Sequence, residues 1–174
     1  MAKFQVFFDY ECPYCKRGYE ALMDLLPSYP GMEIEWRPIE AHPRPEEGHP
    51  PHTDLSCQAY YIGRELGADM PALFKALFQG IAVEKQNVED HDILVNLLKG
   101  IVDREKFLAI LKSGKYAAQV NDNNDLGYEK NEVWFVPAFR VPGNNSPDAP
   151  RLDAKGGAGV TRDEIKEFLD KLSK

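Results

Sequence analysis

The segment Lys3–Cys15 reads KFQVFFDYECPYC, and the interpretation of the whole sequence starts from it. Residues 3–8 are apolar on both faces of an extended chain, which is typical of a central strand. Two cysteines, Cys12 and Cys15, follow at a spacing that permits a short disulfide. Pro13 favours the first position of a helix, because its missing N–H would have no partner there. The segment therefore predicts a buried strand that leads into a helix with Cys12 at its N-cap.

The chemistry of this cysteine pair depends on its thiolate, which is the nucleophilic form. An N-cap position places the Cys12 sulfur beside unpaired helix N–H groups and the positive end of the helix dipole, so we expect a lowered pKa. Cys15 lies one turn further along and is expected to face the core, where it resolves mixed disulfides formed at Cys12. The intervening residues, Pro13 and Tyr14, bring no cation beside the sulfur and predict an intermediate redox potential.

A zinc site is the alternative interpretation of a cysteine pair. Structural zinc sites need four ligands in most cases, and only Cys57 and the histidines remain to complete one. A proline between the cysteines also fits a helix start better than a zinc-binding turn. We therefore predict no metal site and expect Cys57 to pack as a small apolar residue. Solvation at the surface accounts for the four histidines, which are His42, His49, His52 and His91.

The order of sequence patterns predicts a domain interrupted by an insertion. A strand, helix and strand come first, a long stretch with helical periodicity follows, and two strands and a helix end the chain. We therefore predict a thioredoxin-like domain in residues 1–42 and 131–174, and an inserted helical domain in residues 54–130. Residues 133–141 are expected to form a strand, and the polar residues 115–130 a long exposed helix with a solvated acidic face.

Composition narrows the classes of partner. Hydrophobic residues make up 43% of the chain and charged residues 28%, as in ordinary globular proteins. The net charge of -7 argues against nucleic acid or an anionic membrane as the partner. There is no run of 18 apolar residues, and the first residues lack the apolar core of a signal peptide. We expect a cytoplasmic protein, with both monomer and homodimer left open.

Several stretches resemble one family. Residues 8–15, followed by Gly18, resemble the active-site segment of the DsbA-like thioredoxin family, in particular its cytoplasmic FrnE-like branch. Residues 136–139, which read Val-Pro-Ala-Phe, resemble the family's valine–cis-proline segment. Further positions are similar to the helical insertion of that branch, namely residues 73–78, Asp90, Leu94, Asp103 and Phe107. The resemblance covers nearly the whole chain.

The resemblance implies an α/β thioredoxin fold, with a mixed central sheet interrupted by a helical subdomain. It implies a thiol–disulfide oxidoreductase, or disulfide isomerase, that exchanges Cys12 and Cys15 with the disulfides of proteins, peptides or small thiols. It also implies that Pro137 is cis and lies against the cysteine pair, and that the main chain of Val136 pairs with an extended substrate. No bound cofactor is expected, and glutathione or a thioredoxin system is the expected reductant.

The sequence leaves two alternative functions open, and it departs from the family at one position. The first alternative is a glutathione-dependent isomerase or transferase of the same superfamily, which typically has a serine or a single cysteine at the Cys12 position. The second is a binding module that never forms the disulfide. The departure is Val6, which occupies the position of a buried acid in thioredoxin and DsbA proper. Asp9 is closer to the motif and is interpreted as a capping or turn residue, which leaves the base for Cys15 open.

Overall fold

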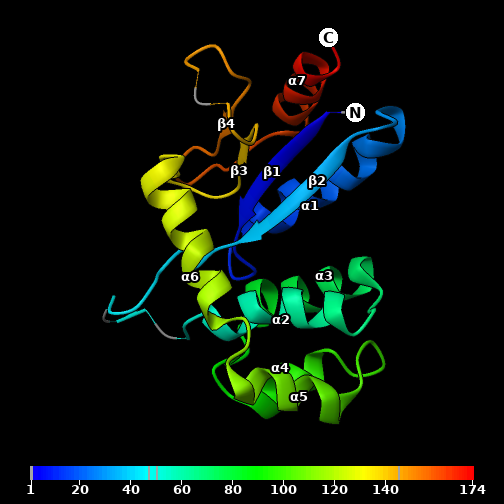
Figure 1. The fold of residues 1–174 in the computed structure, drawn as a ribbon, viewed down its shortest axis with the longest axis vertical. Coiled ribbons are helices and arrows are strands. Elements are labelled where there is room, and N and C mark those ends of the chain that lie inside the picture. The colour runs from blue at the N-terminus through cyan, green and yellow to red at the C-terminus, as the bar shows by residue number, and fades with distance from the viewer. Residues whose placement is uncertain (1, 47, 50, 145) are drawn as a thin grey trace.

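A four-stranded mixed sheet forms the centre of the computed structural model, which describes residues 2–46, 48–49, 51–144 and 146–174. The strand order is β2-β1-β3-β4 (Figure 1). β1 is parallel to β2 and antiparallel to β3, and β3 is antiparallel to β4. The strands are β1 (Lys3–Phe8), β2 (Glu33–Pro38), β3 (Ala138–Arg140) and β4 (Leu152–Asp153). The predicted α/β class and thioredoxin-like sheet are confirmed.

The central strand β1 is buried on both faces, as its sequence predicts. Phe4 and Val6 face a cluster formed with α1 (Pro13–Leu25) and α7 (Arg162–Leu172). Phe7 faces the opposite side, where it packs against Ile39, Val133 and Ala138. The α7 helix begins with a capping box between Thr161 and Glu164, the arrangement that its sequence pattern favours. The sheet therefore holds the start of α1 at the carboxyl end of β1.

The long stretch between β2 and β3 is helical. Figure 1 shows α2–α5 gathered at the carboxyl end of β1, with α6 returning toward the sheet. Residues 54–130 are all described, and no strand lies among them. The helices are α2 (Asp54–Glu65), α3 (Met70–Phe78), α4 (His91–Leu97), α5 (Arg104–Ser113) and α6 (Ala117–Asp125). π-helical turns at Gln79–Val83 and Leu126–Lys130 extend α3 and α6. None of the helices in the described part of the chain is long and apolar enough to cross a bilayer.

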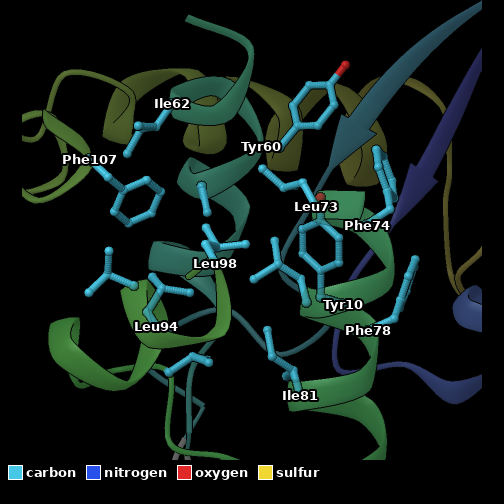
Figure 2. Packing of buried hydrophobic residues seen from close by; sticks show 14 of the residues in the cluster. Tyr10, Tyr60, Ile62, Leu73, Phe74, Phe78, Ile81, Leu94, Leu98 and Phe107 are labelled. Carbon is cyan, nitrogen blue, oxygen red and sulfur yellow. The ribbon is translucent and has the colours of Figure 1, made fainter. Parts of the chain in front are cut away.

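Aromatic and aliphatic side chains fill the core between these helices and the sheet (Figure 2). Tyr10, which belongs to the loop after β1, lies in this core and contacts Phe74 and Phe78 of α3. Phe8 at the end of β1 also contacts Phe74. The loop that carries the cysteines is therefore held between the sheet and the helices.

Two predicted elements differ from the structure. The polar stretch 115–130 is not a uniformly exposed helix, because Asn123 is fully buried and its amide donates to Pro38 O at 3.0 Å and to the Tyr61 hydroxyl at 2.6 Å. These bonds replace the water that a polar amide requires. The predicted strand 133–141 shrinks to β3, and its first part instead forms irregular chain beside the cysteine loop. The last of the two strands expected near the end of the chain is β4, which spans only Leu152–Asp153.

Candidate active site

Cys12 lies at the N-cap of α1, with the extended backbone conformation that N-caps adopt (φ −83°, ψ 114°). Pro13 occupies the first turn of the helix, as predicted. The main-chain N–H of Cys15 donates to the Cys12 sulfur over 3.3 Å, so the sulfur takes the place that a serine or aspartate oxygen holds in ordinary caps. Cys12 is half-buried and Cys15 is fully buried, and all three cysteines are free thiols.

The two sulfurs differ in acidity because their surroundings differ. A hydrogen bond with the Cys15 thiol, followed by the N–H groups of Cys15 and Tyr14, lowers the pKa of Cys12, although burial and the charge of Asp9 oppose this effect. Burial raises the pKa of the Cys15 thiol well above its usual value, and the interaction with Cys12 adds to the rise. The outer sulfur is therefore the more readily ionised nucleophile, and the inner sulfur stays protonated.

The segment before β3 meets the cysteine pair. The peptide bond between Val136 and Pro137 is cis, and the Cys12 thiol donates to Val136 O over 3.6 Å. Pro137 also lies against α1 at Gly18, where a Cβ atom would stand 3.1 Å from the Pro137 Cγ. Glycine at this helical position thus permits the close approach of the proline ring. Val136 and Pro137 lie beside the cysteines, where the resemblance placed them.

Asp9 is a fully buried acid at the base of the cysteine loop. Its carboxylate accepts hydrogen bonds from the N–H of Ala41 at 2.7 Å, the hydroxyl of Thr53 at 2.8 Å and the N–H of Glu11 at 3.2 Å. Burial raises the pKa of Asp9 to about 7, and the negative charge of Glu11 adds to the rise. The three hydrogen bonds oppose it. Its charge acts on both sulfurs of the pair.

The sequence alone did not predict that Asp9 is a buried acid beneath the cysteine loop. Asp9 was interpreted as a turn or cap residue, and it does accept the Glu11 N–H two residues on, as a turn residue would. Its other two donors lie 32 and 44 residues away in the sequence, and no local pattern connects them. The neighbouring Tyr10, which the structure buries completely, is the one local feature that could have suggested a buried loop here.

A cleft of about 490 Å³ opens beside Cys12. One wall carries Trp134 and Phe135, large side chains that are 81% and 55% exposed. Glu11, His42 and His49 also line this cleft. The histidines were expected to be simply solvated surface residues, but two of them line this cleft and stack on each other with ring centroids 3.5 Å apart.

The remaining predicted residues divide between the site and the core. Tyr14 lines the cleft, and its side chain packs where Gly159 would otherwise carry a Cβ, at 2.7 Å from the Tyr14 Cβ. Gly159 has a φ of +70°, so both its conformation and this contact favour glycine. Cys57 is fully buried in α2, as predicted, and burial raises the pKa of its thiol well above the usual value.

This fold and this pair of free cysteines at a helix N-terminus define a thioredoxin-like protein. The family model of the DSBA-like thioredoxin domain matches residues 3–158, so the chain belongs to that family. No curated protein sequence matches it at a significant level.

Solved structures share the fold over nearly the whole chain. One is a probable DsbA oxidoreductase from Streptomyces coelicolor, with a TM-score of 0.78 and 17% identity, covering 99% of this chain and 90% of that one. Another is DsbA of Pseudomonas aeruginosa, with a TM-score of 0.70 and 21% identity, covering 97% and 80%. A third is a thioredoxin-like oxidoreductase from Silicibacter pomeroyi, with a TM-score of 0.67 and 20% identity, covering 97% and 84%.

Proposed function

We propose that this protein is a thiol–disulfide oxidoreductase that acts through Cys12 and Cys15, in the FrnE-like manner that its motif resembles. The observation that carries the proposal is the Cys12 sulfur at the N-cap, which accepts the Cys15 N–H at 3.3 Å and faces Val136 O at 3.6 Å. Such a sulfur is stabilised as a thiolate and opens on a cleft of about 490 Å³.

The exchange reaction has two steps that use the two sulfurs in turn. The Cys12 thiolate attacks one sulfur of a substrate disulfide, so that a mixed disulfide forms and the other substrate sulfur leaves as a thiolate. The Cys15 thiol then loses its proton and attacks Cys12, which releases the second substrate sulfur. The enzyme pair is oxidised to a disulfide while the substrate is reduced to two thiols. The same steps in reverse oxidise a substrate dithiol, and the reduction potential decides the net direction.

The proton that leaves Cys15 requires a nearby acceptor, because burial keeps this thiol protonated. We assign that role to Asp9, the fully buried carboxyl group at the base of the loop. It stands three residues before Cys12 in the sequence, whereas Val6 occupies the position of the acid in thioredoxin and DsbA proper. A carboxyl group whose pKa is about 7 can both accept and return a proton near neutral pH.

The substrate that fits this cleft is an extended peptide with an apolar side chain beside its cysteine. Among the described residues, the Val136 N–H donates to no other protein group. It is therefore free to pair with the main chain of a peptide, in the manner of an added strand. Trp134 and Phe135 offer exposed aromatic surface next to it, which binds apolar side chains well.

Reduction of insulin by dithiothreitol tests the proposed activity. We expect the wild-type protein to accelerate the precipitation of insulin chains and Cys12→Ser to be inactive. Cys15→Ser should accumulate a mixed disulfide with the substrate, visible by mass spectrometry, because no resolving thiol remains. Cys57→Ser is the matched control and should keep full activity, since Cys57 is buried in α2.

Two outcomes would refute the proposal and distinguish the alternatives. A wild-type protein no faster than Cys12→Ser, but active on a glutathione–chromene substrate, would make it a glutathione-dependent isomerase. A cysteine pair that stays reduced during mild oxidation, measured by mass spectrometry, would make it a binding module. The reduction potential of the pair would then separate an oxidant from a reductant in the remaining case.

A further inference from the structure

Three side chains with metal-binding atoms lie close together in the lining of the cleft. Glu11 belongs to the cysteine loop, and His42 and His49 belong to the loop between β2 and α2. One carboxylate oxygen and one ring nitrogen from each histidine all lie within 4.8 Å of one another. The His42 Nε2 is 3.6 Å from the Glu11 Oε1, and the His49 Nδ1 is 4.0 Å from the Glu11 Oε2. Both separations exceed those of hydrogen bonds, so the trio surrounds a gap rather than closing on itself.

The orientation of His42 is set by a second carboxylate. Its Nδ1 lies 3.0 Å from the Glu46 Oε2, where the ring N–H donates to the carboxylate. The other ring nitrogen of His42, Nε2, is the one that faces Glu11. Metal-binding histidines almost always have this arrangement, in which the ring nitrogen away from the metal donates to a carboxylate or carbonyl.

His49 carries a polar atom without a partner. Its Nδ1 is buried and makes no hydrogen bond among the described residues. Its ring stacks on that of His42, with an angle of 16° between the planes. The stacked rings hold the two histidines side by side next to Glu11. A buried nitrogen left unpaired is unfavourable, and a metal ion would satisfy it.

We propose that Glu11, His42 and His49 bind a divalent transition-metal ion of the Zn²⁺ type. Imidazole and carboxylate together suit Zn²⁺, which keeps tetrahedral ligands about 3.3 Å apart at bond lengths of about 2.0–2.1 Å. The two histidine nitrogens lie 3.6 and 4.0 Å from the two oxygens of Glu11, so all three side chains must move closer together to reach this spacing. Three protein ligands leave the fourth position open to the cleft that Cys12 also lines. The proposal replaces the expectation from sequence that no metal is bound.

One neighbouring charge limits the affinity. Lys85 lines the same cleft, and its positive charge disfavours a cation there. We therefore expect weaker binding than at a structural zinc site, with the metal exchanging freely with solvent. Glu46 partly offsets this charge from the far side of His42.

Calorimetric titration with Zn²⁺ tests the site without using redox activity. The background is the variant Cys12→Ser with Cys15→Ser, which removes the thiolates that would themselves bind zinc. We expect one Zn²⁺ per chain, and a tetrahedral visible spectrum when Co²⁺ replaces it. His42→Ala and His49→Ala should each weaken binding at least tenfold. Glu46→Gln, which leaves all three ligands in place, should weaken it about tenfold.

His91→Ala is the matched control, because His91 begins α4 and does not line the cleft; its binding should be unchanged. Far-UV circular dichroism checks that each variant is folded, and Glu46→Gln keeps the test valid if a histidine variant fails to fold. Absence of a one-to-one heat signal at millimolar Zn²⁺ would overturn the proposal. So would binding that survives His42→Ala and His49→Ala unchanged, since the metal would then be bound by other residues. Neither result bears on the exchange activity of the cysteine pair.

Discussion

Replacing Asp9 with asparagine should remove the pH dependence of stability that this buried acid imposes. The pKa of Asp9 rises from 3.8 to about 7 on folding, so the folded protein holds a proton that the unfolded chain has released between these values. The contribution of protonated Asp9 to the free energy of unfolding is therefore fully present below pH 3.8. It is lost as the pH rises to about 7. A difference of about 3 pKa units corresponds to about 4 kcal/mol, because each unit is worth about 1.36 kcal/mol.

The amide of Asp9→Asn can keep most of the hydrogen bonds. Its oxygen can take the Oδ2 position and accept from Ala41 N–H and the Thr53 hydroxyl, which lie at 2.7 and 2.8 Å. Its nitrogen then faces the Glu11 N–H and loses that bond, the longest of the three at 3.2 Å. The loss costs about 1 kcal/mol. We expect the variant to be about 1 kcal/mol less stable than its parent at pH 4 and about 3 kcal/mol more stable at pH 8.

Urea-induced unfolding at a series of pH values measures this difference. Both proteins should carry Cys12→Ser and Cys15→Ser, so that no active-site thiol titrates, and the buffer should contain a chelator to remove metal ions. All other titrations are shared and cancel in the comparison. A difference in unfolding free energy that stays constant from pH 4 to pH 8 would refute the reasoning, because Asp9 would then ionise as it does in water.

Further predictions concern reactivity and packing. Iodoacetamide should modify Cys12 alone in the folded, reduced protein, with Cys57 reacting only after unfolding because burial raises the pKa of its thiol; mass spectrometry of digests gives the sites. Gly18→Ala gains about 1 kcal/mol of helix propensity but brings a Cβ to 3.1 Å from the Cγ of Pro137, so we expect near-unchanged stability and slower insulin reduction. Arg140→Met should destabilise the protein by about 3 kcal/mol in urea, since three main-chain carbonyls lose a buried donor; an unchanged midpoint would contradict this.

The parts of the fold that local sequence determines could be predicted. The strand before Cys12 is apolar on both faces, and Pro13 marks the first turn of α1. Thr161 and Glu164 mark the last helix in the same way. Each of these signals lies within a few residues of the element that it predicts, so no knowledge of the tertiary structure is required.

The parts of the site that distant residues create could not be predicted. The surroundings of Asp9 are set by Ala41 and Thr53, which lie 32 and 44 residues away in the sequence and reach it only in the folded chain. His42 and His49 look like polar loop residues in the sequence, and only the loop's return toward Glu11 brings them together. In the same way, Trp134 and Phe135 have the composition of a strand, but they lie exposed beside the cleft.

The strand order has a consequence for how the chain matures on the ribosome. β1 is made first and needs a partner on each edge, but β3 emerges about 130 residues after it, as the pairing of Val6 with Phe139 requires. At a synthesis rate of about 5–20 residues per second, one edge of β1 stays open for roughly 7–26 s. The helical region is complete before β3 arrives and already covers Phe8 at the end of β1. The insertion buries Phe8, whereas Phe4, Val6 and Phe7 pack in other clusters and the edge that pairs with β3 stays open until β3 is made.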